Sequence, residues 1–475
     1  MTQNRFFHFL AFLGAVFLAG ACASSSNPDV ERGSMFKFQD GHPEVRLSAI
    51  GLLNEQDEAV IKVSADVVYG SLIYKSDNDG ERTYASVTIE VRITGKEGTD
   101  FNDTFSQAME IESNGNQLVQ SQEFFSFDRQ VEVIPGEFDV FLTVKDNTSG
   151  KATTREASTV IPDPAIPVVN LTTVRMLGKN IQDENQFLPI TTYDVPSRID
   201  SLQFVFQVTN NTLEDPLEIR TRMIRFRTDS TIARPMNYNN YNVSSIQYKG
   251  IDYDKFDEVD SSIRRLDQAG SVLIEFNFER FQRGNYRFEV ETGREGEEPI
   301  FKARDFSVKS QNYPAVKTSR ELARPLYYLM DEDEYEEMLE IQNPDSLKEA
   351  IDRFWLSNVR SVSDAKNVIK MYYERVEEAN KQFSNFKEGW KTDTGMIYIL
   401  FGPPWFVETS VNQMLWSYSY DRSDPRYNYF FERPRMPNEF YPFNNYLLER
   451  NQQYFNVQYQ QVQRWLNGSI LRRGI

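Results

Sequence analysis

The sequence has little of what most catalytic and metal-binding sites are built from. Its 475 residues include one cysteine and two histidines. Disulfide frameworks, Cys/His zinc sites, Cys–His dyads and multi-His metal sites are therefore excluded, and we expect neither a metal nor a cofactor. Positive charge is also scarce, because 52 Lys and Arg stand against 70 Asp and Glu, a formal net charge of −18. That deficit argues against a nucleic-acid partner, since binding to phosphates needs a cationic surface.

The N-terminus reads as a targeting segment. Arg5 precedes an apolar run at residues 9–18, which is shorter than the roughly 20 residues of a spanning helix. Residues 1–21 therefore predict a signal peptide, and Ala-Gly-Ala before Cys22 resembles the lipobox of bacterial lipoproteins. An ordinary secretory signal is the alternative. Residues 22–40 suit a polar tether. We expect a lipid-anchored envelope protein, in the outer membrane because Ala23 and Ser24 follow the cysteine, with the leaflet left open.

Two strand-rich segments follow the tether. Residues 41–162 and 168–310 alternate apolar and polar side chains and are separated by a proline-rich linker. This pattern predicts two tandem immunoglobulin-like β-sandwiches. A short echo supports the repeat: residues 135–140 match residues 283–288 at an offset of 148, and the same offset joins Thr159 to Ser307.

Helical periodicity begins after the second segment. Residues 315–388 contain an acidic stretch at 331–340, a capping pattern at 346–349, and an apolar stripe along residues 363–384. The acidic stretch predicts a solvated helix face, with a docking strip for a basic partner as the alternative. Residues 452–471 predict a final helix with Phe455, Val462, Trp465 and Leu466 facing inward.

The C-terminal quarter carries the most recognisable motif. Residues 389–404 read GWKTDTGMIYILFGPP, and Gly389, Trp390, Thr392 and Asp393 form the signature of the GWxTD-domain family, which the chain resembles. The resemblance runs on to Gly402-Pro403-Pro404, although Trp405 stands where the family often has an acid. It implies an α+β GWxTD domain over residues 389–475 in an exported or lipid-anchored bacterial protein. No activity is established for the family, so the resemblance implies no catalytic residue.

The motif residues suit a structural role. Gly389 would end a helix in the left-handed conformation, and Trp390 would pack over a helix–strand junction. Thr392 and Asp393 would bond their own turn backbone before a strand at residues 396–401, which Gly402-Pro403-Pro404 would stop. The alternative is an aspartic-protease Asp-Thr-Gly at 393–395, but the chain has no second such tripeptide.

A second candidate site lies further along the C-terminal region. Residues 390–475 hold Lys391 and eight arginines against seven acids, in a chain that is otherwise strongly acidic. Arginine and aromatic side chains alternate there, which is typical of interface hot spots. The candidate interaction patch consists of Arg422, Arg426, Tyr427, Tyr429, Arg433 and Arg435. An ordinary sheet with one packed face is the alternative.

These features favour a non-enzymatic envelope lipoprotein that acts as a structural or interaction module. Its expected partners are envelope proteins with an acidic surface, contacted through the GWxTD domain, and the membrane through the lipid anchor. A glycan-binding lipoprotein that uses the C-terminal aromatics is the alternative. A hydrolase built on paired carboxylates is a weaker one, because the sequence places no two acids at catalytic separation.

Overall fold

The computed structural model describes residues 42–77, 82–96, 98–113, 124–163, 165–167, 169–180, 186–212, 216–238, 242, 244–294, 298–359, 361–421, 424, 426–434 and 445–472. The expected signal peptide, the lipidation site Cys22, and two arginines of the candidate patch, Arg422 and Arg435, lie outside these residues. Among the helices of the described part, none is long and apolar enough to cross a membrane.

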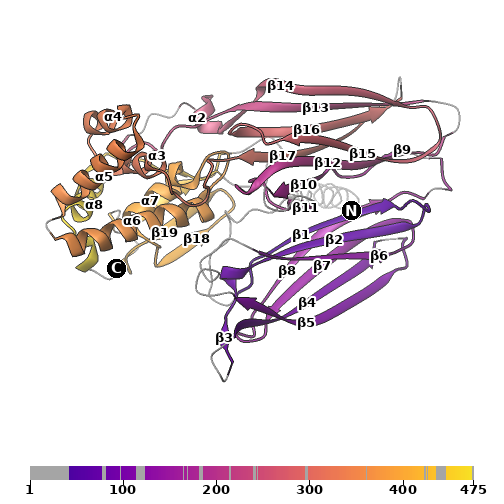
Figure 1. The fold of residues 1–475 in the computed structure, drawn as a ribbon, viewed down its shortest axis with the longest axis horizontal. Helices are drawn as coiled ribbons and strands as arrows, with labels where there is room; N and C mark the ends of the chain where they lie inside the picture. The colour runs from indigo at the N-terminus through magenta and orange to yellow at the C-terminus, as the bar shows by residue number, and fades with distance from the viewer. Residues whose placement is uncertain are drawn as a thin grey trace, which may run out of the picture.

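The first sandwich is formed by two antiparallel sheets (Figure 1). One has the order β1-β2-β6, and the other has the order β3-β4-β7-β8 with β5 paired to β4. Alternation along β4 buries Val87, Ile89 and Val91 between the sheets. The strands are β1 (Val45–Leu53), β2 (Ala59–Val68), β3 (Lys75–Ser76), β4 (Thr83–Gly95), β5 (Asn102–Ser113), β6 (Phe124–Glu132), β7 (Gly136–Asp146) and β8 (Ala152–Ile161).

The second sandwich repeats this topology. Its sheet order β14-β13-β16-β17 corresponds to β5-β4-β7-β8, and β10-β12-β15 corresponds to β1-β2-β6. Strands β7 and β16 begin at Gly136 and Gly284, so the offset of 148 falls on matching strands and the tandem sandwiches are confirmed. The strands are β9 (Val169–Leu171), β10 (Arg175–Asn180), β11 (Phe187–Pro189), β12 (Ile199–Asn210), β13 (Leu217–Thr228), β14 (Ile251–Leu266), β15 (Gly270–Glu279), β16 (Gly284–Gly293) and β17 (Ile300–Val308).

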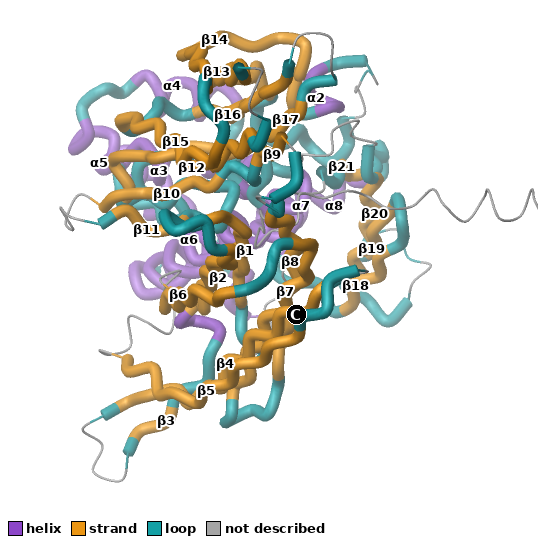
Figure 2. Tube along the Cα trace, turned by 90° about the vertical axis from the view of Figure 1, so that its right-hand side faces the viewer, coloured by secondary structure: helices purple, strands orange, loops and turns teal. Residues whose placement is uncertain are grey.

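The two sandwiches lie against each other along their length (Figures 1 and 2). Gln207 of β12 donates to the Leu53 carbonyl over 2.7 Å and accepts from the Leu53 amide over 2.8 Å. The hydroxyl of Thr191 donates to the buried carboxylate of Asp66 over 2.8 Å. These buried hydrogen bonds connect the first sandwich to the second.

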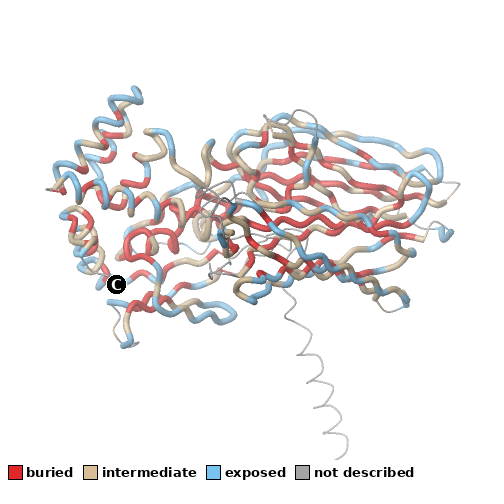
Figure 3. Tube along the Cα trace, turned by 60° about the horizontal axis from the view of Figure 1, so that its bottom comes forward, coloured by how far each residue is buried: buried red, intermediate tan, exposed pale blue. Residues whose placement is uncertain are grey.

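The C-terminal region is a helical layer with a small sheet, and it covers one end of the second sandwich (Figure 1). One hydrophobic core runs from Ala233 to Ile470 and crosses residue 389 without a break. Buried segments are drawn in red in Figure 3, and they run through the region that carries the C-terminus. The sheet order is β18-β19-β20-β21. The elements are α2 (Ile246–Lys249), α3 (Ser319–Ala323), α4 (Glu332–Glu340), α5 (Pro344–Asn358), α6 (Val362–Phe383), α7 (Asp393–Phe401), β18 (Phe406–Thr409), β19 (Gln413–Ser417), β20 (Asn428–Glu432), β21 (Leu447–Leu448) and α8 (Tyr454–Leu466).

Three local predictions for this region are wrong. Residues 396–401 form the end of helix α7 rather than a strand, because Thr392 caps a helix there and the wholly apolar run carries no period of its own. Helix α5 begins earlier than the capping pattern at 346–349, since Asn343 caps it and Pro344 occupies its first turn. Phe455 of α8 is exposed, although Trp465 is fully buried as expected.

Candidate functional site

The GWxTD signature lies in a buried loop between two helices. Helix α6 ends at Phe383, and residues 384–397 are all buried. The Ser384 hydroxyl accepts from the Gly389 amide over 2.7 Å, and the Asn380 side chain accepts from the Trp390 amide over 3.1 Å. The last turn of α6 thereby holds the start of the signature in place.

The two glycines near the signature are needed for close approach. A Cβ on Gly389 would lie 1.8 Å from the carbonyl oxygen of Ala379, and one on Gly395 would lie 1.8 Å from that of Gly389. Gly389 does not adopt the left-handed conformation that we expected, and it does not end a helix. It lets the loop touch α6, and Gly395 lets α7 touch the loop.

Trp390 packs in the helical core rather than over a helix–strand junction. Its ring is buried and meets Tyr328 edge to face, with ring centroids 6.4 Å apart. The Tyr328 hydroxyl donates to the Trp390 carbonyl over 2.6 Å, and the Lys391 ammonium lies 5.3 Å above the ring. The signature tryptophan therefore contacts both an aromatic ring and a cation inside the core.

Asp393 forms a buried ion pair. Both of its oxygens accept from the Arg450 guanidinium over 2.7 Å, and one also accepts from the Leu448 amide over 2.8 Å. Arg450 further donates to the carbonyls of Pro235 and Arg234. The expected bond from Asp393 to its own turn is wrong, because the carboxylate joins α7 to β21 instead. A carboxylate held in this way suits structure and not the shared-proton chemistry of a protease.

Thr392 and Gly402 bound helix α7. The Thr392 hydroxyl accepts from the Gly395 amide over 3.0 Å as an N-cap and donates to the Gly389 carbonyl over 2.7 Å. Gly402 ends the helix with φ of +84°, and its carbonyl accepts from the Tyr418 hydroxyl over 2.7 Å. Pro403 and Pro404 follow at the surface, so the Gly-Pro-Pro stops a helix and not a strand.

The loop before the signature joins the second sandwich. Phe386 packs among Tyr193, Ile224, Phe226 and Ile251. Its carbonyl accepts from the Asn285 side chain over 2.8 Å, and Asn285 in turn accepts from the Tyr193 hydroxyl over 2.8 Å. Lys309 donates to the Asn385 carbonyl over 2.6 Å. Residues far apart in the sequence thus meet at this loop.

Buried charges reinforce the same junction. Glu388 is paired with Arg283 of the second sandwich, and its carboxylate lies 3.0 Å from the Lys391 ammonium. Burial alone would raise the pKa of Glu388, but Lys391, Arg283 and Lys309 together hold it at about 2. Burial lowers the pKa of Lys391 to about 8 against the pull of Glu388. Glu388 therefore remains ionised at neutral pH and connects the loop to Arg283, directly before β16.

Comparison with known families identifies this region. The GWxTD domain family matches residues 254–467, from β14 to the end of α8, and the signature lies inside that match. This is a GWxTD-domain-containing protein. The match begins within the second sandwich, so the GWxTD region includes both sides of the buried junction. A search of curated proteins finds no match.

Similarity to solved structures is weak. A red sea bream transglutaminase matches 56% of this chain and 31% of its own, at 10% identity and a TM-score of 0.17. Dimeric latent PorU from Porphyromonas gingivalis matches 57% of this chain and 20% of its own, at 12% identity and a TM-score of 0.23. An Escherichia coli alpha-2-macroglobulin activated by porcine elastase matches 57% of this chain and 22% of its own, at 10% identity and a TM-score of 0.17. The chain spans a third or less of each protein, and scores this low support no conclusion about the GWxTD protein.

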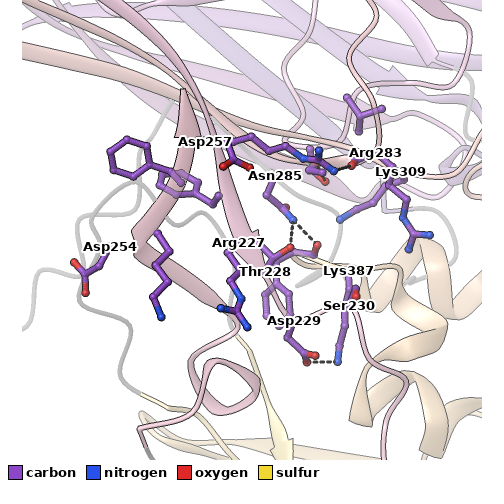
Figure 4. Close-up of a pocket in the computed structure, with 18 residues that line it drawn as sticks. Arg227, Thr228, Asp229, Ser230, Asp254, Asp257, Arg283, Asn285, Lys309 and Lys387 are labelled. Atoms are coloured by element: carbon purple, nitrogen blue, oxygen red, sulfur yellow. Dashed lines mark hydrogen bonds and ion pairs between the residues drawn. The ribbon is translucent and has the colours of Figure 1, made fainter. Parts of the chain in front are cut away.

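A pocket opens beside the junction of the GWxTD protein (Figure 4). Its volume is about 790 Å³, within the range of small-molecule sites. The ends of β13 and β17, the starts of β14 and β16 and the loop at residues 386–387 form its walls. Sequence reasoning missed this pocket because its walls come from five separate stretches of chain. Among the described residues no cluster of three or more metal-ligating side chains occurs.

The candidate arginine–aromatic patch is only partly on the surface. Tyr429 is fully buried in the core, whereas Tyr427 is exposed. Arg426 is exposed and pairs with Asp424 over 2.8 Å, and Arg433 is half-buried. The acidic helix α4 lies away from this sheet in both Figure 1 and Figure 2, so it does not cover the patch.

A different group of aromatics is more exposed than the patch itself. Trp405 and Phe406 each lie close to Tyr420, with ring centroids 5.1 and 6.1 Å apart, and Tyr420 is 82% exposed. Phe430 of β20 is also exposed. We call Trp405, Phe406, Tyr420 and Phe430 the aromatic face. The position of Trp405 directly after Gly-Pro-Pro was the one available signal in the sequence.

Proposed function

We propose that this protein is a non-enzymatic, lipid-anchored envelope protein that contacts other envelope proteins through its GWxTD domain. One observation carries the proposal. The polar groups of the signature are bound within the fold: Asp393 by Arg450, Thr392 as a helix cap, and Glu388 nearby by Lys391 and Arg283. Groups engaged in this way stabilise an assembly of domains and are not free to react with a substrate.

The aromatic face supports a role in binding. Large aromatic side chains cluster at interface hot spots because each buries much area at little entropic cost. Trp405, Phe406 and Tyr420 meet outside the core. Partner recognition would then combine apolar contact with the arginines of the candidate patch, which favour an acidic protein surface.

A pull-down from envelope extract tests this function. The full mature chain carrying Trp405→Ala and Tyr420→Ala should lose a partner that the wild type retains. The matched control is Phe455→Ala with Tyr459→Ala, because that pair is equally exposed on α8 but lies outside the aromatic face. Loss in the first variant alone supports the proposal, and an identical partner set in all three proteins contradicts it.

Glycan binding is a second candidate, favoured by the same ring cluster. Exposed aromatic rings stack on sugars as well as on protein side chains, and Trp405 with Tyr420 offers two such rings. Retardation of the wild type in a gel containing envelope polysaccharide, lost in the Trp405→Ala and Tyr420→Ala variant, would favour glycan binding over a protein partner.

The anchor requires a separate test because Cys22 lies outside the described residues. Its position after Ala-Gly-Ala and its status as the one cysteine of the chain support lipidation and an outer-membrane location. Metabolic labelling with a fatty-acid probe should mark the wild type and not Cys22→Ser. Equal labelling of both would contradict the anchor while leaving the contact role of the GWxTD domain intact.

A further inference from the structure

The pocket beside the junction is lined by an excess of cationic side chains. Six of them border it, against three aspartates: Arg225, Arg227, Lys255, Arg283, Lys309 and Lys387. Such a concentration is notable in a chain with a formal net charge of −18. We call this cavity the junction pocket.

The inner wall of the junction pocket is fixed and neutralised. Lys387 pairs with Asp229 over 2.8 Å and also donates to the Thr231 carbonyl over 2.8 Å. Arg283 is held by Glu388, and Lys309 donates to the Asn385 carbonyl. These contacts give the wall a defined shape, which is the preorganisation that a binding site needs.

Two other cations of the junction pocket, Arg227 and Lys255, lack strong partners. Arg227 at the end of β13 makes no side-chain hydrogen bond or ion pair within the part of the chain that the structure describes. The Lys255 side chain is 64% exposed, and its partner Asp252 lies 3.6 Å away. Figure 4 places Arg227 on the same side of the pocket as Asp229 and Lys387.

Hydrogen-bond donors therefore exceed acceptors in the junction pocket. An arginine offers five N–H groups in a planar fork that matches a carboxylate or a phosphate, and a lysine offers three. Two of the aspartates remain as opposing charges, but Asp254 lies apart from Arg227 in Figure 4 and Asp257 lies nearer to Asn285. The unpaired donors are concentrated around Arg227.

We propose that the junction pocket binds a small molecule with two or more phosphate or carboxylate groups. Arg227 and Lys255 contact the ligand, and Lys387, held by Asp229, gives the wall beside them a fixed shape. Charge-assisted hydrogen bonds of this kind are about twice as strong as neutral ones. Because its walls come from the second sandwich and the GWxTD loop, a bound anion would link the two parts. This site is separate from the aromatic face and does not depend on the contact function.

Isothermal titration of the full mature chain tests the proposal. Inorganic pyrophosphate and citrate serve as the phosphate and carboxylate probes. We expect saturable binding of at least one of them, with weaker binding as ionic strength rises to a physiological level, where screening acts over about 8 Å. Arg227→Gln with Lys255→Gln should lower the affinity about tenfold or more.

Two further variants keep the test decisive. Arg220→Gln is the matched control, because Arg220 is exposed on the same strand but pairs with Glu218 outside the junction pocket. Its affinity should equal that of the wild type. Asp257→Asn should bind more tightly, since one opposing charge is removed. Absence of binding at millimolar probe, or equal affinities in the wild type and the double variant, would overturn the proposal.

Discussion

The two sandwiches share a topology but differ in what covers one sheet. In the first sandwich, Asp139 of β7 lies on the outer side of its sheet, partly exposed, 3.0 Å from Lys96. The matching residue of the second sandwich is Arg287 of β16, which is buried and bound to Asp305 over 2.6 Å. The aromatic rings of Phe226 and Tyr253 lie over its guanidinium. The matching position is thus partly exposed in the first sandwich and buried in the second.

The GWxTD match begins inside the second sandwich, on the sheet that contacts the loop before the signature. The loop before the signature packs against the sheet β14-β13-β16-β17. There the Phe386 carbonyl accepts from Asn285, and Glu388 pairs with Arg283. Residues 190–195 add a link, since Thr191 bonds to the first sandwich and Tyr193 to Asn285. The second sandwich is the central element that the first sandwich and the helical region both contact.

Substitution at the matched pair Arg287 and Asp139 gives the largest expected contrast. Arg287→Ala leaves the Asp305 carboxyl, whose pKa burial already raises, without its cation in a buried site. We expect a loss of about 3–5 kcal/mol in the free energy of unfolding. Asp139→Ala removes a partly exposed pair and should cost less than about 1 kcal/mol. Chemical denaturation measures both, and equal costs would mean that the second sheet is not covered in solution.

The signature ion pair tests whether the second sandwich unfolds with the helical region. Asp393→Ala leaves Arg450 buried without its partner and should cost about 3–5 kcal/mol. Amide hydrogen exchange should accelerate in β16 and β17 but not in β7 and β8. Asp424→Ala is the control, because its pair with Arg426 is at the surface. Faster exchange in all four strands would show that the first sandwich also unfolds together with the helical region.

Acid should destabilise the second sandwich because Glu388, which pairs with Arg283, becomes protonated. Its pKa is about 2 when folded and 4.5 ordinarily, so the unfolded chain binds the proton more readily between these values. The stabilisation is present above about pH 4.5 and is lost as the pH falls toward 2, a change of about 3 kcal/mol. Denaturation of Glu388→Gln should lack that part of the pH dependence. Glu110→Gln in the first sandwich should keep it, because Glu110 is exposed.

Asn285 and Glu137 occupy matching positions on β16 and β7, and the contrast between them should be smaller. Asn285 is buried and bonds to Tyr193, Thr228 and the Phe386 carbonyl. Asn285→Ala should cost about 1–3 kcal/mol because those groups lose their partner. Glu137 is exposed, so Glu137→Ala should leave the melting temperature unchanged. A destabilised Glu137→Ala would indicate that the first sandwich is covered as well.

The two sandwiches could be predicted from the sequence because the patterns that indicate them extend over only a few neighbouring residues. Alternation along β4 and the echo between β7 and β16 can be seen within a few residues. Helix α6 was predicted from its apolar stripe for the same reason. The prediction of a strand at residues 396–401 was wrong because helix α7 is apolar on all sides there, so its apolar residues show no helical periodicity.

The candidate site depended on contacts between distant residues. Asp393 and Arg450 are 57 positions apart, and Asn285 meets Phe386 across 101. Neither spacing carries a periodic signal, so the signature was recognised as structural while its partners were not found. The contact between the two sandwiches was missed for the same reason, because Gln207 and Leu53 are 154 positions apart.

The smallest expected effect concerns that contact. Gln207→Ala removes both buried amide bonds to Leu53, and the shorter side chain leaves space in which water can replace them, so we expect a cost of about 1 kcal/mol. Gln203→Ala on the same strand is the control, since its amide bonds stay within the second sandwich. Small-angle scattering should show a larger radius of gyration for the Gln207 variant only. If both variants keep the wild-type radius, the bond between Thr191 and Asp66 is sufficient to hold the first sandwich, and the two sandwiches are joined chiefly through residues 190–195.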